Sequence, residues 1–198
     1  MTVLNLQVSS SADDVKDYGG WQPASVDAAI GQLAGLPQGS WFTWNNVIIP
    51  DNSIITAAQI LCQEKSSFGS GSSVNVKAAF IDQDNATMPV SQADADSRPM
   101  TAFTSPETTW FPTGSGDPWI AIDVTVPVKA IMDRAGQHYG DRLSGHIHGG
   151  TNVGTVYIAI YQYDTAAASA AKLDISFTDN LVMSGDEGSV FYNVYTGW

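Results

Sequence analysis

The sequence predicts an all-β fold, a jelly-roll-like antiparallel β-sandwich with one short helix, and three observations support this prediction. Short runs in which apolar and polar residues alternate recur along the chain, with the period of two that is typical of strands with one buried face. Glycine and proline interrupt these runs, and the chain has 18 Gly and 9 Pro. Its 198 residues suffice for one domain whose core needs no disulfide.

The strand pattern recurs in segments spread over the whole chain. It is clearest where Val156, Ile158 and Ile160 share one face of a run that ends near Tyr163. Turn residues separate neighbouring segments, as at Gly149-Gly150. In chain order, the predicted strands are Val3–Val8, Trp41–Ile49, Ile55–Gln63, Val74–Ile81, Trp119–Val126, Leu143–His148, Val156–Tyr163, Leu173–Thr178 and Val190–Tyr195.

Helical periodicity is limited to two segments. Residues 128–135 place their apolar side chains on one stripe, and Gly136 follows where a helix is expected to end. A weaker helical pattern covers Val26–Leu33. The alanine-rich segment Ala166–Ala171 predicts a loop or a single helical turn.

The sandwich is expected to occupy residues 1–178, with residues 179–198 as a C-terminal extension. In that extension, Val190 and Phe191 begin a run that is apolar on both faces. Such a run is too apolar to remain exposed on a monomer. We therefore expect an extra strand of the same sandwich or an assembly arm that packs against a neighbouring subunit.

The charge of the chain excludes one class of partner. Twenty acidic residues against eight basic ones give a net charge of −12, which repels the phosphate backbone of nucleic acids. No apolar run approaches the ~20 residues that span a membrane, so we expect no membrane partner. The first residues lack the pattern of a signal peptide, which predicts assembly in the cytoplasm.

Two groups of residues are weak candidates for a metal site. His146 and His148 share one face of a strand and suit a transition metal if further ligands approach, but two solvent-facing histidines explain the pattern equally well. Asp82 and Asp84 offer oxygen ligands of the kind that Ca²⁺ prefers, although acidic loop residues are most often turn formers. We expect no cofactor, with a structural calcium ion as the alternative.

Asp123 lies within an otherwise apolar strand, where a carboxylate needs hydrogen-bond donors. Glycoside hydrolysis needs a second carboxylate, and the sequence offers no clear partner. We therefore predict that Asp123 and Thr125 form a structural fastener at the Asp-Val-Thr corner. Cys62 shares a face with Ile60, so we expect a small buried hydrophobe rather than a nucleophile. These features predict a protein that is not an enzyme.

Aromatic residues are the remaining candidates for contacts with a partner or a glycan. Trp41 and Trp44 lie on opposite faces of one strand, so only one is expected to point into the core. Tyrosine and tryptophan stack on sugar rings and are also enriched in protein interfaces. The candidate contact residues are Trp41, Tyr157, Tyr161, Tyr163, Phe191, Tyr195 and Trp198.

The order of several segments resembles a known family. The segments are Trp41–Leu61 with its Ile-Pro turn, Val74–Asp84, Arg98–Thr101, Trp119–Thr125, and the helix and strands that follow up to Phe177. They resemble the DNRLRE-type, carbohydrate-binding-module-like β-sandwich domains, and within these the phage-encoded branch. The resemblance covers roughly residues 10–178 and implies a sandwich fold.

The resemblance implies a virion protein of a tailed phage, either a head decoration or a tail-associated subunit. Its expected partners are other virion proteins such as capsid or tail subunits and further copies of itself in a homo-oligomer. The alternative is a carbohydrate-binding or adhesion module that uses exposed Trp and Tyr to bind a cell-surface glycan.

Overall fold

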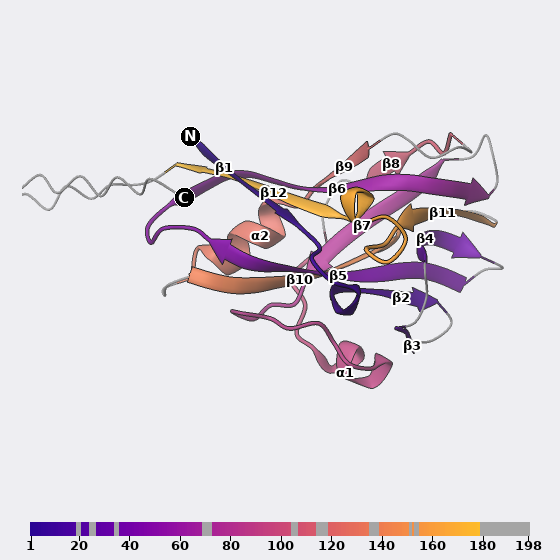
Figure 1. Ribbon diagram of the computed structural model, residues 1–198, viewed down its shortest axis with the longest axis horizontal. Coiled ribbons are helices and arrows are strands. Elements are labelled where there is room, and N and C mark those ends of the chain that lie inside the picture. The colour runs from indigo at the N-terminus through magenta and orange to yellow at the C-terminus, as the bar shows by residue number, and fades with distance from the viewer. Residues whose placement is uncertain are drawn as a thin grey trace, which may run out of the picture.

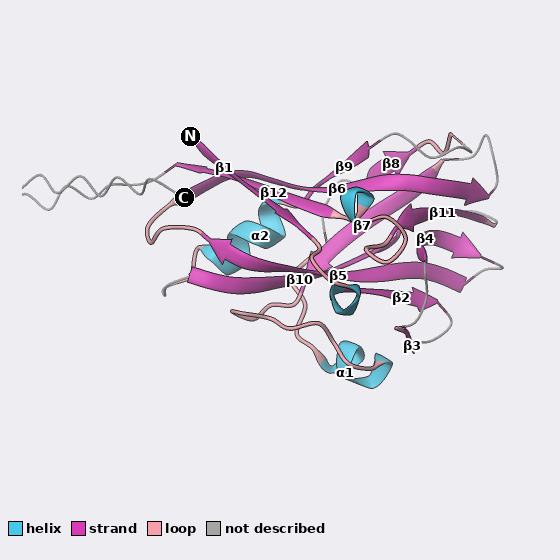
Figure 2. Cartoon of the chain, in the orientation of Figure 1, coloured by secondary structure: helices cyan, strands magenta, loops and turns pink. Residues whose placement is uncertain are grey.

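Strands account for most of the chain, and every strand pair among the described residues is antiparallel, so the predicted all-β sandwich is confirmed. Figures 1 and 2 show the computed structural model. It describes residues 1–18, 21–23, 27–33, 36–68, 73–103, 107–113, 119–134, 139–150, 152 and 155–178. The expected C-terminal strand Val190–Tyr195 and the extension 179–198 lie outside the described residues.

The elements follow one another with two α-helices and two short 3₁₀ helices among the strands of the described residues. The strands are β1 (Thr2–Gln7), β2 (Asp14–Tyr18), β3 (Trp21–Gln22), β4 (Asp27–Leu33), β5 (Leu36–Ile48), β6 (Ile54–Phe68), β7 (Val74–Phe80), β8 (Thr108–Trp110), β9 (Trp119–Asp123), β10 (Tyr139–Gly149), β11 (Val156–Tyr161) and β12 (Lys172–Thr178). The helices are α1 (Gln92–Ser97), α2 (Thr125–Met132), η1 (Ser11–Asp13) and η2 (Ala167–Ser169).

The long strand β6 belongs to both layers of the sandwich. Its first part pairs with β12 and β9, and its last part pairs with β11. Sheet A therefore consists of β1, β12, β6 and β9, in which β1 and β9 are the outer strands. Sheet B continues from β11 through β4, β5, β10 and β7 to β8, with β2 also paired to β5.

The main core lies between the two sheets. In β12, Leu173, Ile175 and Phe177 are buried while the alternate residues are half-buried, which is the expected pattern for a strand with one face against the core. The apolar stripe of α2 also packs into this core. The largest fully buried side chains include Trp44, Trp110, Phe42 and Phe80.

The second predicted helix was wrong, because its residues form strand β4. Ala28 and Ile30 are fully buried, and β4 pairs with β11 on one side and β5 on the other. A strand inside a sheet is apolar on both faces, so its sequence does not alternate and is easily taken for a buried helix. Helix α2 begins at Thr125, earlier than predicted, because Pro127 is tolerated in a first turn.

Residues 81–103 cover part of the outer face of sheet B. This covering segment includes α1, which was too short to be predicted from periodicity. A second apolar cluster lies between this segment and sheet B. It is formed by Val15, Trp41, Ile81, Ala86 and Ala95. Both Trp41 and Trp44 are consequently buried, on opposite faces of β5. Only Trp44 points into the main core, as expected, while Trp41 packs into the second cluster. No helix in the described part of the chain is long and apolar enough to cross a membrane.

Candidate binding groove on the outer face of sheet A

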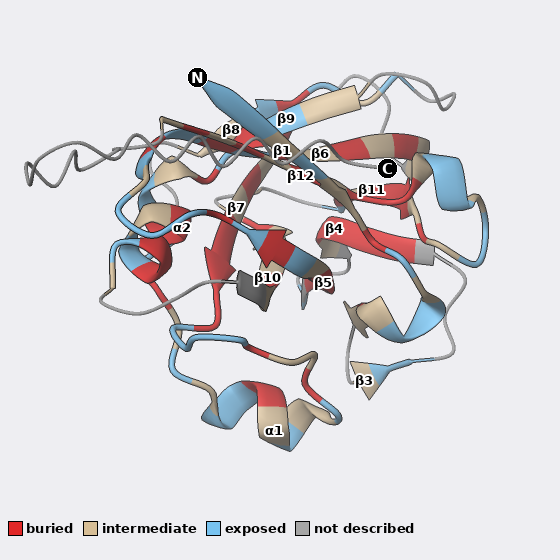
Figure 3. Ribbon diagram, turned by 60° about the vertical axis from the view of Figure 1, so that its left-hand side comes forward, coloured by how far each residue is buried: buried red, intermediate tan, exposed pale blue. Residues whose placement is uncertain are grey.

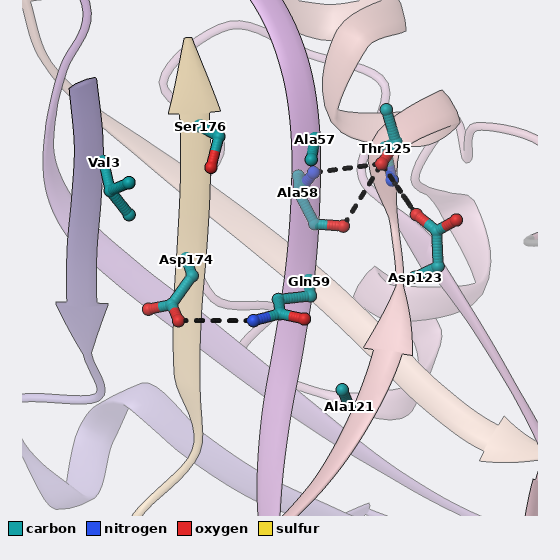
Figure 4. A pocket seen from close by; sticks show the side chains of 9 residues that line it. All are labelled: Val3, Ala57, Ala58, Gln59, Ala121, Asp123, Thr125, Asp174 and Ser176. Carbon is teal, nitrogen blue, oxygen red and sulfur yellow. Dashed lines mark hydrogen bonds between the residues drawn. The ribbon is translucent and has the colours of Figure 1, made fainter. Parts of the chain in front are cut away.

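A groove of about 550 Å³ lies on the outer face of sheet A. Its floor is low because Ala57 and Ala121 have small side chains, while longer polar side chains rise around them (Figure 4). Because successive strand residues point to opposite faces, the same alternation that buries Ile60 and Ile122 directs these residues outward. The lining residues are Val3, Ala57, Ala58, Gln59, Ala121, Asp123, Thr125, Asp174 and Ser176.

A row of four polar side chains crosses all four strands of sheet A. The register aligns Asn5 of β1 with Asp174 of β12, Asp174 with Gln59 of β6, and Gln59 with Asp123 of β9. Asn5 Nδ2 donates to Asp174 Oδ1 at 2.7 Å, and Gln59 Nε2 donates to Asp174 Oδ2 at 3.5 Å. We call these four residues the polar row. It presents amide and carboxylate groups that can bind hydroxyl groups of a ligand.

Trp119 lies beyond the polar row on the same outer face. It pairs with Gln63 at the far end of β9, and Ala121 separates it from Asp123 along the strand. The ammonium group of Lys172 lies 4.1 Å from the centroid of its indole ring, a cation–π contact. Trp119 was not among the contact residues predicted from the sequence. Its alternation with Ile120 and Ile122 was the signal that could have placed it on the outer face.

Asp123 is exposed, and its carboxylate fastens the junction between β9 and α2. Oδ1 accepts hydrogen bonds from Thr125 N at 2.9 Å and Thr125 Oγ1 at 2.7 Å. Thr125 Oγ1 also accepts a bond from Ala58 N at 3.0 Å, which connects this junction to β6. The structure therefore brings Asp123 and Thr125 together, and it places the pair at one edge of the groove (Figure 4).

The other aromatic candidates among the described residues do not line the groove. Trp41 retains only 3% of its exposure beneath the covering segment, so its proposed contact with a partner or glycan is corrected by the structure. Tyr157 and Tyr161 belong to β11 and are half-buried, and Tyr163 packs against the main core. The remaining candidates, Phe191, Tyr195 and Trp198, lie outside the described residues.

The two candidate histidines belong to a mostly buried cluster on sheet B. The imidazole of His146 stacks on Trp41, with ring centroids 4.5 Å apart and planes 9° from parallel. Its Nε2 lies 3.7 Å from Asp17 Oδ2. His148 Nδ1 lies 2.6 Å from the carbonyl oxygen of Gly149, and Phe103 contacts the same ring edge-on. The histidines thus face neighbouring side chains, and the alternative in which both face solvent does not describe them.

Burial controls the protonation of this cluster. Desolvation, together with a smaller contribution from the charge of His148, lowers the pKa of His146 to about 3. The pKa of His148 is also lowered, mainly by desolvation. Burial raises the pKa of Asp17, while hydrogen bonding opposes that change. His146 and His148 are therefore neutral in the folded protein near pH 7.

The acidic turn that suggested calcium contains ion pairs with an arginine. Arg134, just after α2, pairs with Asp82 and with Asp84, the latter at 3.0 Å. Arg142 Nε donates to Asn85 Oδ1 at 3.2 Å in the same turn. Within the described residues, no group of three or more His, Cys, Asp and Glu side chains is arranged to hold a metal ion. The carboxylates of this turn connect it to the end of α2.

Two titratable groups lie inside the main core. Cys62 is a free thiol whose predicted burial is confirmed, and desolvation raises its pKa to about 12. Glu64 is fully buried and accepts bonds from Trp110 Nε1 at 3.3 Å and Thr113 N at 3.2 Å. These contacts fasten the segment after β8 to β6, and neither group reaches the groove.

Comparison of the chain with protein-family models found no match, and comparison with curated proteins found none either.

Proposed function

We propose that this chain is a non-enzymatic virion structural protein of a tailed phage, a head decoration or a tail-associated subunit built on a carbohydrate-binding-module-like sandwich. The observation that carries the proposal is the order of the segments that resemble the phage-encoded domains. Trp41–Leu61 supplies most of β5 and the first part of β6, Val74–Asp84 contains β7, and Trp119–Thr125 contains β9. The resembling segments therefore supply strands of both sheets.

The groove supports a role in binding rather than in catalysis. Asp174 accepts bonds from Asn5 and Gln59, and Asp123 accepts bonds from Thr125, so both carboxylates have local structural partners. Gln59 stands between them in the polar row. This arrangement favours ligand recognition by hydrogen bonds over an acid–base pair that acts on one bond.

Mass spectrometry and immunogold electron microscopy of purified phage particles from the source culture test the proposal. We expect the chain to copurify with particles through a density gradient and the antibody to label the head or the tail. A chain abundant in the lysate and absent from intact particles would contradict the assignment. Labelling of the head or the tail also decides between a decoration and a tail-associated role.

A second candidate function, recognition of a cell-surface glycan, is favoured by the groove. Trp119 offers an aromatic surface next to Lys172, and the polar row offers amide and carboxylate groups on the same face of sheet A. Sugar rings stack on aromatic faces while their hydroxyl groups bind such polar groups.

Glycan-array binding tests this second candidate with three proteins. The wild type should bind a defined set of glycans, and Trp119→Ala should reduce that binding by roughly fivefold, since stacking with an aromatic ring contributes about 1 kcal/mol. Val90→Ala is the matched control, because Val90 is 82% exposed in the covering segment of sheet B. Equal binding by Trp119→Ala and the control would contradict glycan recognition in the groove.

A further inference from the structure

We propose that the outer edge of β1 is a self-association surface, at which two copies of this chain pair their β1 strands antiparallel about a two-fold axis. Sheet A would then continue from one copy into the other. The inference deepens the proposed role as a subunit of a homo-oligomer. It rests on that role only for the assembly in which the pairing would serve. Its test uses the purified protein, so failure of the pairing and failure of the virion assignment give different results.

Strand β1 has one unpaired side among the described residues. All six of its residues, Thr2 to Gln7, pair with β12 on one side. No described strand pairs with its other side. An edge strand of this kind presents backbone N–H and C=O groups that a further strand can pair with. Figure 3 shows the start of β1 exposed at the outside of the molecule.

The edge of β1 lacks the features by which proteins usually block strand pairing. Its sequence, TVLNLQ, contains neither lysine nor proline. Its register with β12 runs from Thr2↔Phe177 to Gln7↔Lys172 without a shift, so no bulge interrupts the strand. By contrast, β6 and β10 both contain register shifts. The backbone of β1 is therefore regular enough to accept a partner strand along its length.

Charge favours a second copy of this chain as the occupant. A chain with a net charge of −12 repels its own copies wherever acidic faces meet. β1 carries no charged side chain, and the nearest carboxylate in the adjacent strand, Asp174, accepts a hydrogen bond from Asn5. Two β1 strands can therefore approach each other without placing like charges in direct opposition.

Apolar side chains at this end of sheet A also favour association. Met1 is 83% exposed and Val3 is 50% exposed, and Ile54, at the matching end of β6, is 48% exposed. In a two-fold pairing centred on Leu4, the outward-facing Val3 would lie opposite the partner subunit's Asn5. An interface of this type is isologous and closes at two copies, so the regular edge gives a dimer rather than a fibre.

Sedimentation equilibrium of wild type, Val3→Lys and Val90→Lys tests the proposal. The wild type should form a dimer of twice the 21.0 kDa chain mass. Val3→Lys places a charge on the outward face at the pairing edge and should raise the dimer Kd by roughly tenfold or more. Val90→Lys makes the same substitution at another exposed valine but lies in the covering segment of sheet B, so it should remain dimeric.

All three proteins should melt at similar temperatures when measured as monomers at high dilution, because both substituted positions are exposed. A wild type that remains monomeric at millimolar concentration would overturn the inference. Equal dimer Kd values for the two lysine variants would also overturn it.

Hydrogen exchange at two protein concentrations identifies the occupant of the edge. If a second copy covers β1, protection of its amides should increase with concentration in the wild type and should not in Val3→Lys. Protection that is strong and independent of concentration would assign the edge to another segment of the same chain and overturn the pairing. Unprotected amides in a dimeric wild type would place the dimer interface elsewhere.

Discussion

The two outer faces of this sandwich differ in whether their tryptophan is covered by another segment of the chain. On sheet A, Trp119 remains on an open face next to the polar row and the groove. On sheet B, Trp41 is covered by residues 81–103 and stacks on His146. Both tryptophans lie on the face of their strand that points away from the main core. The difference is the covering segment, which turns one outer face into a second core and leaves the other available for binding.

The side chains that form each outer face are consistent with this difference in covering. The outer face of sheet A is built from small and hydrogen-bonding side chains such as Ala57, Gln59 and Ser176, which lose little when exposed to water. On sheet B, Trp41 is buried in one apolar cluster with Ile81 and Ala86 of the covering segment. The comparison indicates that substitutions on sheet B should mainly affect stability, while substitutions on sheet A should mainly affect binding.

The largest difference should come from removing the two tryptophans. Trp41→Ala should lower the free energy of unfolding by about 3–5 kcal/mol, because it leaves a large cavity beneath the covering segment. Trp119→Ala removes a ring from an open face and should cost less than about 1 kcal/mol. Urea unfolding followed by circular dichroism measures both values. Equal losses would mean that the two faces are not distinguished by burial.

Gly39 should be the next most sensitive position, because it makes room for the histidine cluster. A Cβ added at Gly39 would lie 2.3 Å from His146 Nε2 and 3.2 Å from His148 Cβ. Gly39→Ala should therefore destabilise the protein by about 2 kcal/mol through overpacking.

Gly145 is an internal control on β10, because a Cβ there would lie no closer than 3.1 Å to the nearest ring atom, Phe80 Cε1. Gly145→Ala should cost less than Gly39→Ala. In addition, the cost of Gly39→Ala should shrink when His146 is already replaced by alanine, as measured in a double-mutant cycle. An unchanged cost in the His146→Ala background would show that the imidazole is not the group displaced.

Acidification should lower the free energy of unfolding through the histidine cluster on sheet B, by less than the tryptophan substitution does. The pKa of His146 is about 3 in the folded protein, below its ordinary value of 6.5, so the unfolded chain binds the additional proton as pH falls below about 6.5. Its contribution to stability is therefore present above pH 6.5 and is lost progressively toward pH 3. Between pH 7 and pH 5 we expect a loss of about 1–2 kcal/mol from this residue.

Buried carboxyl groups oppose this loss. Burial raises the pKa of Asp14 to about 6, so the folded protein takes up that proton before the unfolded chain does, and stability increases as pH falls from about 6 toward 3.8. The effect of His146 is isolated by comparing the wild type with His146→Gln, which retains Asp14. Unfolding titrations at pH 7, 6 and 5 should give a steeper loss on acidification for the wild type. Parallel profiles would refute the assigned protonation.

The sequence predicted the two-layer architecture well, because alternation records which residues of a strand face the core. Strand β12 shows this, since Leu173, Ile175 and Phe177 were recognised as one face and are buried. The pattern failed for β4, in which Ala28, Ala29 and Ile30 are buried in succession because the strand lies inside sheet B. There, pairing with distant strands rather than local periodicity determined the structure.

The candidate site was less predictable, because its residues meet through strand register. Asp123 and Thr125 are close in sequence and were recognised together, but Asn5, Gln59 and Asp174 come from three distant strands. Nothing in the local sequence records that these side chains align. Likewise, Trp41 carries the pattern of an outward-facing aromatic residue, and only the fold places residues 81–103 over it.

The smallest expected effect concerns Asp123, the residue that joins the open face to the fold. Asp123→Ala should remove two hydrogen bonds at the start of α2 and lower the free energy of unfolding by about 1 kcal/mol, because the bonded groups regain partners in water at this exposed position. Asp123→Asn keeps an oxygen that can accept from Thr125 N and should lose roughly half as much. Both variants should leave dimer formation at β1 unchanged, because β12 and β6 lie between β9 and β1 in sheet A. Urea unfolding and sedimentation equilibrium measure the two properties separately, and an Asp123→Ala variant as stable as the wild type would show that the carboxylate does not fasten the junction.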